Sequence, residues 1–146
     1  MTIGDILRAR RSIRRYTDQP IPRDLLIDLL DAAIWAPSAH NRQPWRFAVT
    51  DSADSQERLA RAMGARLRRD LEADGVAEDV IAADTARSYA RITGAAALVI
   101  LCLSLVDMDT YRDDQRNHLE YLMAVQSTAM AGQNLLLAAE QAGLAA

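Results

Sequence analysis

The sequence contains no lysine, a single cysteine and no long apolar run. All 17 basic residues are arginine, which excludes Schiff-base chemistry and the phosphate-binding lysine of P-loops. The one cysteine, Cys102, excludes an internal disulfide framework and is typical of a reducing compartment. No apolar stretch approaches the ~20 residues that a membrane-spanning helix needs, and we expect no signal peptide. These absences predict a cytoplasmic protein without a membrane anchor.

Charge and length set further bounds. The formal net charge is -3, so no overall basic field exists to attract nucleic-acid phosphates, and we expect no nucleic-acid partner. The 146 residues, half of them hydrophobic, correspond to one globular domain or part of one.

The motifs of several enzyme classes are missing as well. His40 and His118 lie near no nucleophile motif and are too few for a zinc site with one cysteine. The acidic stretch 104–114 lacks the spacing, glycine and terminal glutamate of a calcium loop. No G-x-G-x-x-G or Walker pattern occurs. A redox reaction would therefore need an organic cofactor that is held without a glycine-rich loop.

Hydrophobic periodicity predicts helices and only two secure strands. Helices 55–73 and 76–92 are expected to form a covering hairpin, with the arginines of the first on a solvated face. Strand 96–103 is expected to be buried on both faces, with Cys102 as a small core residue. Because two strands make a marginal sheet, we expect the chain to be incomplete at its C-terminus. The expected helices are 3–9, 23–35, 55–73, 76–92 and 115–142, and the strands are 45–50 and 96–103.

Five arginines lie within residues 8–15. Arginine forks pair bidentately with phosphate or carboxylate, and Ser12 adds a hydroxyl donor. The segment is therefore a phosphate clamp, a solvated basic edge, or a run of arginines that pair with Asp18, Asp24 and Asp28.

A second segment, residues 35–47, joins the helix 23–35 to the strand 45–50. It holds Pro37, Pro44, the amides Asn41 and Gln43, and two tryptophans. A rigid backbone with outward-facing amides suits a planar polar ligand, whereas a proline-bracketed loop with a tryptophan in the core is the purely structural alternative.

The middle of helix 115–142 is rich in small residues over positions 124–134. Small side chains let another backbone approach closely, so this helix is either packed on all sides or packed against its copy in a dimer. Gly143 is the expected C-terminal cap.

Together, the segments 10–14 and 36–45 resemble the nitroreductase family of FMN-dependent oxidoreductases, in their residues, order and separation. The segment 35–47 is most similar to the branch that is fused to the F420 γ-glutamyl ligase. The resemblance covers nearly the whole chain and implies an α+β nitroreductase-like fold, with helices around a central, mainly antiparallel sheet. It also implies a homodimer with FMN at the subunit interface. Family members continue past residue 146 with further strands, so residues 1–146 are expected to be an incomplete, C-terminally truncated domain.

The same resemblance implies roles for particular residues. The phosphate and ribityl chain of FMN would be held by the arginine segment, and the flavin of the partner subunit would be contacted by residues 37–39. Two amides would lie near the polar atoms of the ring, and the backbone after the last helix would lie by its N5 and O4 edge. These residues are Arg10, Arg11, Ser12 and Arg14; Pro37, Ser38 and Ala39; Asn41 and Gln43; and Gly143 and Leu144.

The implied activity is an NAD(P)H oxidoreductase that reduces nitro-aromatic, quinone or related acceptors. Its mechanism would be ping-pong, with hydride passing from NAD(P)H to flavin N5 and then to the acceptor. The chemistry belongs to the cofactor, so no side chain is named as catalytic. Two alternatives remain open. One is another task on the same fold, namely reduction of a dehydro-F420 intermediate or flavin fragmentation. The other is a non-catalytic, truncated module that dimerises through the last helix.

Overall fold

The computed structural model describes residues 2–146, which form two compact units. The first unit comprises residues 2–13, 21–48 and 99–146, and the second comprises residues 14–20 and 49–98. The chain passes between the units within each of its two strands. The elements of the first unit are α1 (Ile3–Ala9), α2 (Arg23–Ile34), the 3-10 turn η1 (Ala39–Asn41), α5 (Asp114–Gln141) and most of β1 (Trp45–Thr50) and β2 (Leu98–Leu103).

The helices of the first unit begin where the sequence predicts, within a residue or two. At α1, the Thr2 hydroxyl accepts from the Asp5 N–H and the Asp5 carboxylate accepts from the Thr2 N–H, at 3.3 and 2.9 Å. This capping box satisfies two donors that a helix start leaves without partners. At α5, the Asp113 side chain accepts from the Arg116 N–H at 2.8 Å, so an aspartate caps the longest helix.

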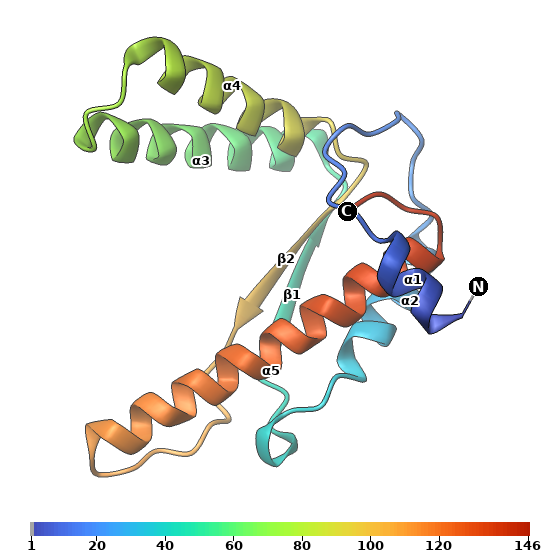
Figure 1. Ribbon diagram of the computed structural model, residues 1–146, viewed down its shortest axis with the longest axis vertical. Coiled ribbons are helices and arrows are strands. Elements are labelled where there is room, and N and C mark those ends of the chain that lie inside the picture. The colour runs from blue at the N-terminus through green and yellow to red at the C-terminus, as the bar shows by residue number, and fades with distance from the viewer. Residues whose placement is uncertain (1) are drawn as a thin grey trace. The chain divides into compact units, whose positions relative to one another are not determined.

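The two strands form a two-stranded antiparallel sheet, with arrows that point in opposite directions in Figure 1. The Ser104 N–H donates to the Pro44 carbonyl at 2.8 Å, which extends the ladder past the ends of both strands. The prediction that β2 is buried on both faces is wrong. Cys102 is exposed and Ile100 is 39% exposed, because α5 packs on one face of β2 and alternate side chains point to the other face.

The core of the first unit lies where α5 crosses this sheet. Trp45, Ala36 and Ala131 are buried together, with Phe47 and Leu101 packed against them. A Cβ on Gly132 would lie 2.9 Å from Leu101 Cδ2, so any other residue here would make the Leu101 side chain shift. Ala131 and Gly132 of α5 therefore face the sheet. The helix is not packed on all sides within the chain, since Leu119, Tyr121 and Met130 on its other surfaces are 50%, 45% and 39% exposed.

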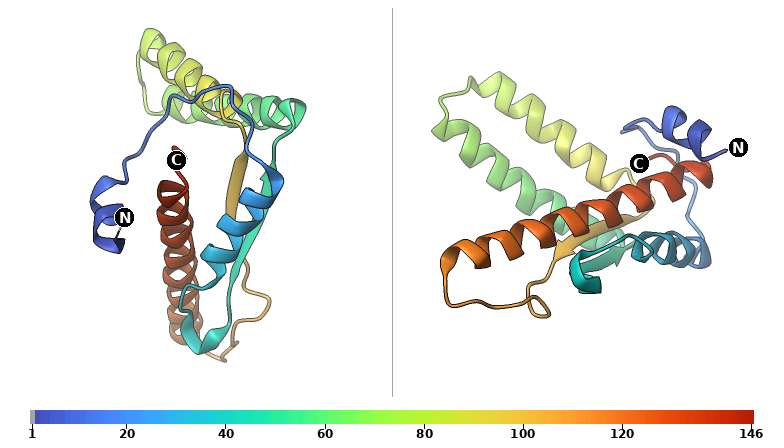
Figure 2. Two further views of the ribbon diagram at one scale, coloured as in Figure 1. Left: turned by 90° about the vertical axis from the view of Figure 1, so that its right-hand side faces the viewer. Right: turned by 60° about the horizontal axis from the view of Figure 1, so that its bottom comes forward.

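The second unit is built on a helical hairpin of α3 (Ala53–Ala73) and α4 (Glu78–Thr93), which lie side by side in Figures 1 and 2. Gly75 joins them with φ +73°, a left-handed conformation that glycine adopts without strain. Ala60 and Ile81 are buried, and the Gln56 amide donates to the Ala95 carbonyl at 2.9 Å. The predicted hairpin is confirmed.

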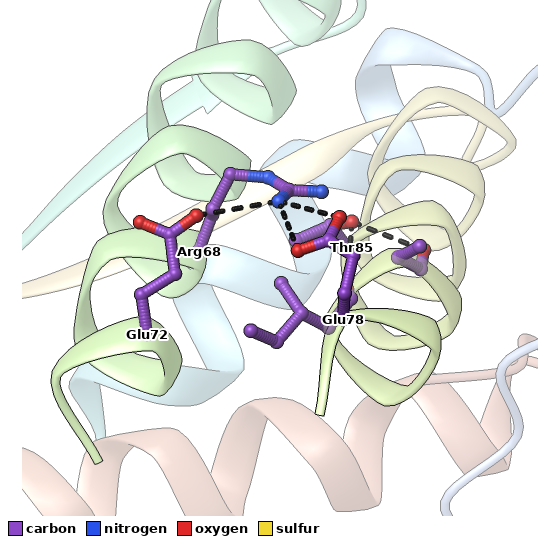
Figure 3. A network of polar contacts seen from close by, with 6 residues as sticks. Arg68, Glu72, Glu78 and Thr85 are labelled. Atoms are coloured by element: carbon purple, nitrogen blue, oxygen red, sulfur yellow. Dashed lines mark hydrogen bonds and ion pairs between the residues drawn. The ribbon is translucent and has the colours of Figure 1, made fainter. Parts of the chain in front are cut away.

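Three of the five arginines of α3 are paired with acids, as predicted for a solvated face. Arg61 pairs with Glu57 and Arg66 with Asp70, each one turn apart. Figure 3 shows Arg68 between Glu72 and Glu78, with its Nη1 at 3.3 and 2.8 Å from their carboxylates. The arginine Arg61 lowers the pKa of the Glu57 carboxyl by donating a hydrogen bond to it. These side chains have their charge neutralised within their own helical hairpin.

Candidate functional site

The arginine segment leaves α1 at Ala9 and runs beside the end of the chain. The Ile13 N–H donates to the Ala146 carbonyl at 3.2 Å, and α1 lies against the C-terminal part of α5. The backbone of residues 10–13 is therefore beside residues 143–146. Within the first unit, the structure thus brings the segment that holds Arg10, Arg11 and Ser12 beside the one that holds Gly143 and Leu144, although they are more than 130 positions apart in the sequence.

The side chains of this segment differ in what they contact. Arg11 Nη1 donates to the carbonyls of Arg8 and Arg10, at 2.6 and 2.8 Å, and so closes the C-terminal end of α1. Among residues 2–146, neither Arg10 nor Ser12 has a side-chain hydrogen bond or ion pair. Arg14, in the second unit, is exposed and lacks an acidic partner in the described chain. Within residues 2–146, none of these arginines pairs with Asp18, Asp24 or Asp28, so the phosphate clamp and the solvated basic edge are the two interpretations that remain.

Gly143 ends α5 in the predicted manner. Its φ is +74°, and its N–H donates to the Glu140 carbonyl at 3.0 Å while the Leu144 N–H donates to the Ala139 carbonyl at 2.9 Å. This pair of bonds is the Schellman motif. Both N–H groups are consequently engaged with the helix, so a ligand at this turn would meet carbonyls, Cα hydrogens and the later amides.

The segment Pro37–Gln43 has an unusual backbone. His40, Asn41 and Gln43 have φ of 51°, 53° and 48°, in the left-handed region that side chains other than glycine rarely adopt. Histidine and asparagine tolerate it better than glutamine. Each such residue costs of order 1–3 kcal/mol and persists only when its surroundings hold it. Strain of this kind is concentrated at ligand-binding sites.

Two serine hydroxyls bond backbone N–H groups of this segment. The Ser38 hydroxyl accepts from the Gln43 N–H at 3.0 Å. Ser127, on α5, is 2% exposed; its hydroxyl accepts from the Ala39 N–H at 3.3 Å and donates to the Met123 carbonyl at 2.7 Å. The turn η1 is thus fixed to the middle of α5.

Two arginines tie the same segment to the loop 104–113. Arg42 Nη2 is 2.6 Å from Asp109, and Arg46 Nη2 is 2.8 Å from Asp107. Arg46 Nη1 also donates to the carbonyls of Gln43 and Trp45, at 3.1 and 2.8 Å. The acidic loop 104–113 therefore supplies partners for Arg42, inside the strained segment Pro37–Gln43, and for Arg46, three residues after it.

The side chains of Asn41 and Gln43 are exposed, and neither amide has a hydrogen-bond partner within residues 2–146. Each amide offers two donors and an acceptor. Trp45 is buried in the core, whereas Trp35 is 79% exposed. Trp45 thus fills the core, as the structural interpretation predicted, and the amides are exposed, while their contact with a ligand stays a prediction.

The predicted site residues of the first unit form two groups. The arginine segment lies at the Gly143 end of α5, and Pro37–Gln43 lies beside Ser127. These points are 16 helix positions apart, which corresponds to roughly 24 Å at the 1.5 Å rise of an α-helix. Pro37, Ser38, Ala39, Asn41 and Gln43 therefore do not meet Arg10, Arg11, Ser12, Gly143 and Leu144 in one chain.

Sequence reasoning missed Ser127, Asp107 and Asp109 as residues around the site. The only signal was charge complementarity, since two arginines flank Gln43 and several aspartates follow β2. Within residues 2–146, no cluster of His, Cys, Asp or Glu is arranged to hold a metal ion. Nor is any described helix long and apolar enough to cross a bilayer.

The family model described as the nitroreductase family matches residues 7–146. A structure from Desulfovibrio desulfuricans, described as a candidate nitroreductase in complex with FMN, is 27% identical with a TM-score of 0.68, over 97% of this chain and 64% of that one. A nitroreductase-like family protein from Bacillus cereus is 25% identical with a TM-score of 0.71, over 99% and 67%. The fold is thus the nitroreductase-like α+β fold, and the chain belongs to the nitroreductase family.

Curated relatives match over shorter segments. The nitrobenzene nitroreductase of Ectopseudomonas oleovorans is 42% identical over 60 residues, which are 41% of this chain and 26% of that protein. The NADH dehydrogenase of Thermus thermophilus is 49% identical over 53 residues, 36% and 26% of the two chains. The matched segments thus span 26–32% of the first curated relatives, and the chain spans 64–67% of the two solved structures.

Proposed function

We propose that this chain binds FMN and acts as an NAD(P)H oxidoreductase on nitro-aromatic, quinone or related acceptors, by a ping-pong mechanism. One observation carries the proposal: within the described residues 2–146, the arginines before residue 16 lack acidic partners, except for Arg8, whose Nη1 is 3.9 Å from Asp5. The α3 arginines Arg61, Arg66 and Arg68, by contrast, are paired. Arginines that no carboxylate neutralises are suited to an anionic ligand.

The phosphate end of FMN fits the arginine segment. Arg10 and Ser12 would donate to the phosphate with their whole side-chain donor sets. Arg11 would contribute only the N–H groups that do not close α1. Arg14 would add a second full guanidinium. Bidentate guanidinium–phosphate pairs are the stronger kind of charge-assisted bond.

The ring end of FMN fits the strained segment. Asn41 and Gln43 would bond the polar edge of the flavin, and Pro37, Ser38 and Ala39 would pack against its face. When bound, FMN supplies the hydride chemistry; the side chains orient it and need not act as acid or base. At Gly143 and Leu144 the contact would come from the backbone that the Schellman motif leaves available.

The two groups of residues support a homodimer. Because they lie roughly 24 Å apart along α5, one flavin would use the arginine segment of one subunit and Pro37–Gln43 of its partner. Leu119, Leu122 and Met130 form an exposed apolar surface on α5, which suits contact with a second copy.

The choice of acceptor is the finer part of the proposal. Nitro-aromatic compounds are the first acceptors to test, because a relative similar over 60 residues is named a nitrobenzene nitroreductase. Membership of the F420 ligase-associated branch rests on the residues of 35–47 alone, so a dehydro-F420 acceptor belongs in the same screen. A colourless dimer that ignores FMN would instead favour the non-catalytic module.

The test is an FMN titration of Arg10→Ala with Arg14→Ala. We expect the double variant to lose at least ~2 kcal/mol of binding free energy, or roughly 30-fold in affinity. The matched control is the double variant Arg66→Ala with Arg69→Ala on α3, which also removes two positive charges. Equal affinities for the two double variants would refute the clamp.

A further inference from the structure

We infer that Asp107 and Asp109 are positioning residues for the proposed flavin site. They hold Arg42 and Arg46, and through these arginines they hold the left-handed backbone that presents Asn41 and Gln43. We call the loop 104–113 with these two carboxylates the acidic latch. This inference rests on the proposed function and adds to it the part that shapes the ring-binding segment.

The contact through Arg46 is the more direct one. Its guanidinium joins three groups: Nη2 is 2.8 Å from Asp107, and Nη1 donates to the Gln43 and Trp45 carbonyls at 3.1 and 2.8 Å. Asp107 therefore fixes the guanidinium, and the guanidinium fixes the peptide group of Gln43. Gln43 is the residue whose left-handed φ of 48° has the least support from its residue type.

Arg42 lies between the two amide residues of the segment. Its Nη2 is 2.6 Å from Asp109, and its N–H donates to the Ala39 carbonyl at 3.0 Å. Releasing Arg42 from Asp109 would free the side chain at the centre of the strained turn. The two ion pairs thus act on adjacent points of one short segment.

The acidic latch is itself fixed at both ends. At its start the Ser104 N–H donates to the Pro44 carbonyl at 2.8 Å. At its end Asp113 caps α5. Between these points the Met108 N–H donates to the Leu105 carbonyl at 3.1 Å. The carboxylates are therefore carried by a loop whose position is set by β2 and α5, which is what a positioning group requires.

The effect of the latch is expected to be local. All four side chains of the two pairs are 38–58% exposed, and exposed ion pairs add little to global stability. The left-handed backbone, however, is unfavourable by itself, so losing its partners allows the segment to relax while the fold remains. This separates a positioning role from a general structural one.

The experiment uses a double variant, the latch variant, that carries both Asp107→Asn and Asp109→Asn. It is compared with a matched control. The control is Glu57→Gln with Asp70→Asn, which removes two exposed ion pairs on α3. Limited trypsin digestion of the flavin-free chains is followed by mass for cleavage after Arg42. We expect cleavage about two- to fivefold faster in the latch variant, with the thermal midpoint of both variants alike.

The FMN-loaded chain gives the readout that a merely structural role would not move. We expect the latch variant to bind FMN more weakly and to shift the flavin absorption band, while the control leaves both unchanged. A charge-reversed variant carries both Arg42→Asp and Asp109→Arg. A protease specific for aspartate is expected to cut this variant after position 42 more slowly than it cuts Arg42→Asp alone, because the ion pair is restored.

The outcomes separate the two proposals. Cleavage, affinity and spectrum equal to the control overturn the positioning role, while FMN binding by the native chain leaves the proposed function standing. Failure of the native chain to bind FMN overturns the proposed function; faster cleavage of the latch variant in that case still supports the latch, and unchanged cleavage overturns it.

Discussion

Replacing Ser127 by alanine tests whether α5 holds the strained segment Pro37–Gln43. The Ser127 hydroxyl is the acceptor for the Ala39 N–H at 3.3 Å, at a site where the side chain is 2% exposed. Its removal leaves that N–H without a partner, which costs ~1–3 kcal/mol. Alanine is the better helix former by ~0.5 kcal/mol. The net expectation is a loss of ~0.5–2.5 kcal/mol in the free energy of unfolding.

The assay is urea unfolding followed by tryptophan fluorescence, since Trp45 lies in the core next to this segment. The matched control is Ser88→Ala in α4, a mid-helix serine without a side-chain hydrogen bond in the described chain. It gains helix propensity and loses nothing, so we expect it to be ~0.5 kcal/mol more stable.

The comparison of the two serine variants decides the point. If Ser127→Ala is as stable as Ser88→Ala, the hydroxyl does not hold η1 and the argument is refuted. If Ser127→Ala is destabilised and its FMN affinity also falls, α5 supports the proposed site as well as the core.

Two further predictions concern packing and pH. Gly132→Ala would place a Cβ 2.9 Å from Leu101, and such overpacking costs ~1–3 kcal/mol. The control is Gly64→Ala, where nothing lies within 4 Å of the added Cβ and alanine gains ~1 kcal/mol. The free energy of unfolding should be lower for Gly132→Ala than for Gly64→Ala, and equal values would contradict the close approach. The pKa of Asp113 is lowered, first by the Arg116 backbone N–H and then by its side chain, so its cap on α5 is fully present above the ordinary aspartate pKa and is lost as the pH falls through the lowered value. The urea midpoint should therefore drop in acid less steeply for Asp113→Ala than for the native chain, and parallel curves would contradict this.

Much of the fold follows from local patterns in the sequence. The capping box at Thr2 and the glycine after α5 set helix ends because they satisfy backbone groups near them in the chain. The solvated face of α3 was readable because Arg61, Arg66 and Arg68 each have an acid one turn away. Such features need only a few neighbouring residues.

The features that were wrong or missed depend on distant parts of the chain. An apolar run predicts a strand, but whether both of its faces are covered depends on what packs there, and Cys102 is exposed. The left-handed φ of Gln43 has no residue signature. Ser38 holds its N–H locally, but the Arg46 guanidinium at its carbonyl is paired with Asp107 across 61 positions. Likewise, only the fold brings Ser127 beneath Ala39.

The candidate site also has one part that local sequence patterns predicted and one part that depends on the fold. The residue types of the arginine segment left an anion clamp and a solvated edge open, and Arg10, which has no acidic partner within residues 2–146, fits both. The separation of this segment from Gln43 along α5 was not readable from spacing in the sequence. It is the reason that the proposed site needs two copies of the chain.

The measurement that tests the account most directly is an FMN titration of the native chain by flavin fluorescence, with the mass in solution measured on the same sample. We predict tight binding by a dimer with one FMN per chain. Binding of FMN by a monomer would contradict the division of the site between subunits. A dimer or monomer that does not bind FMN at all would contradict the central claim.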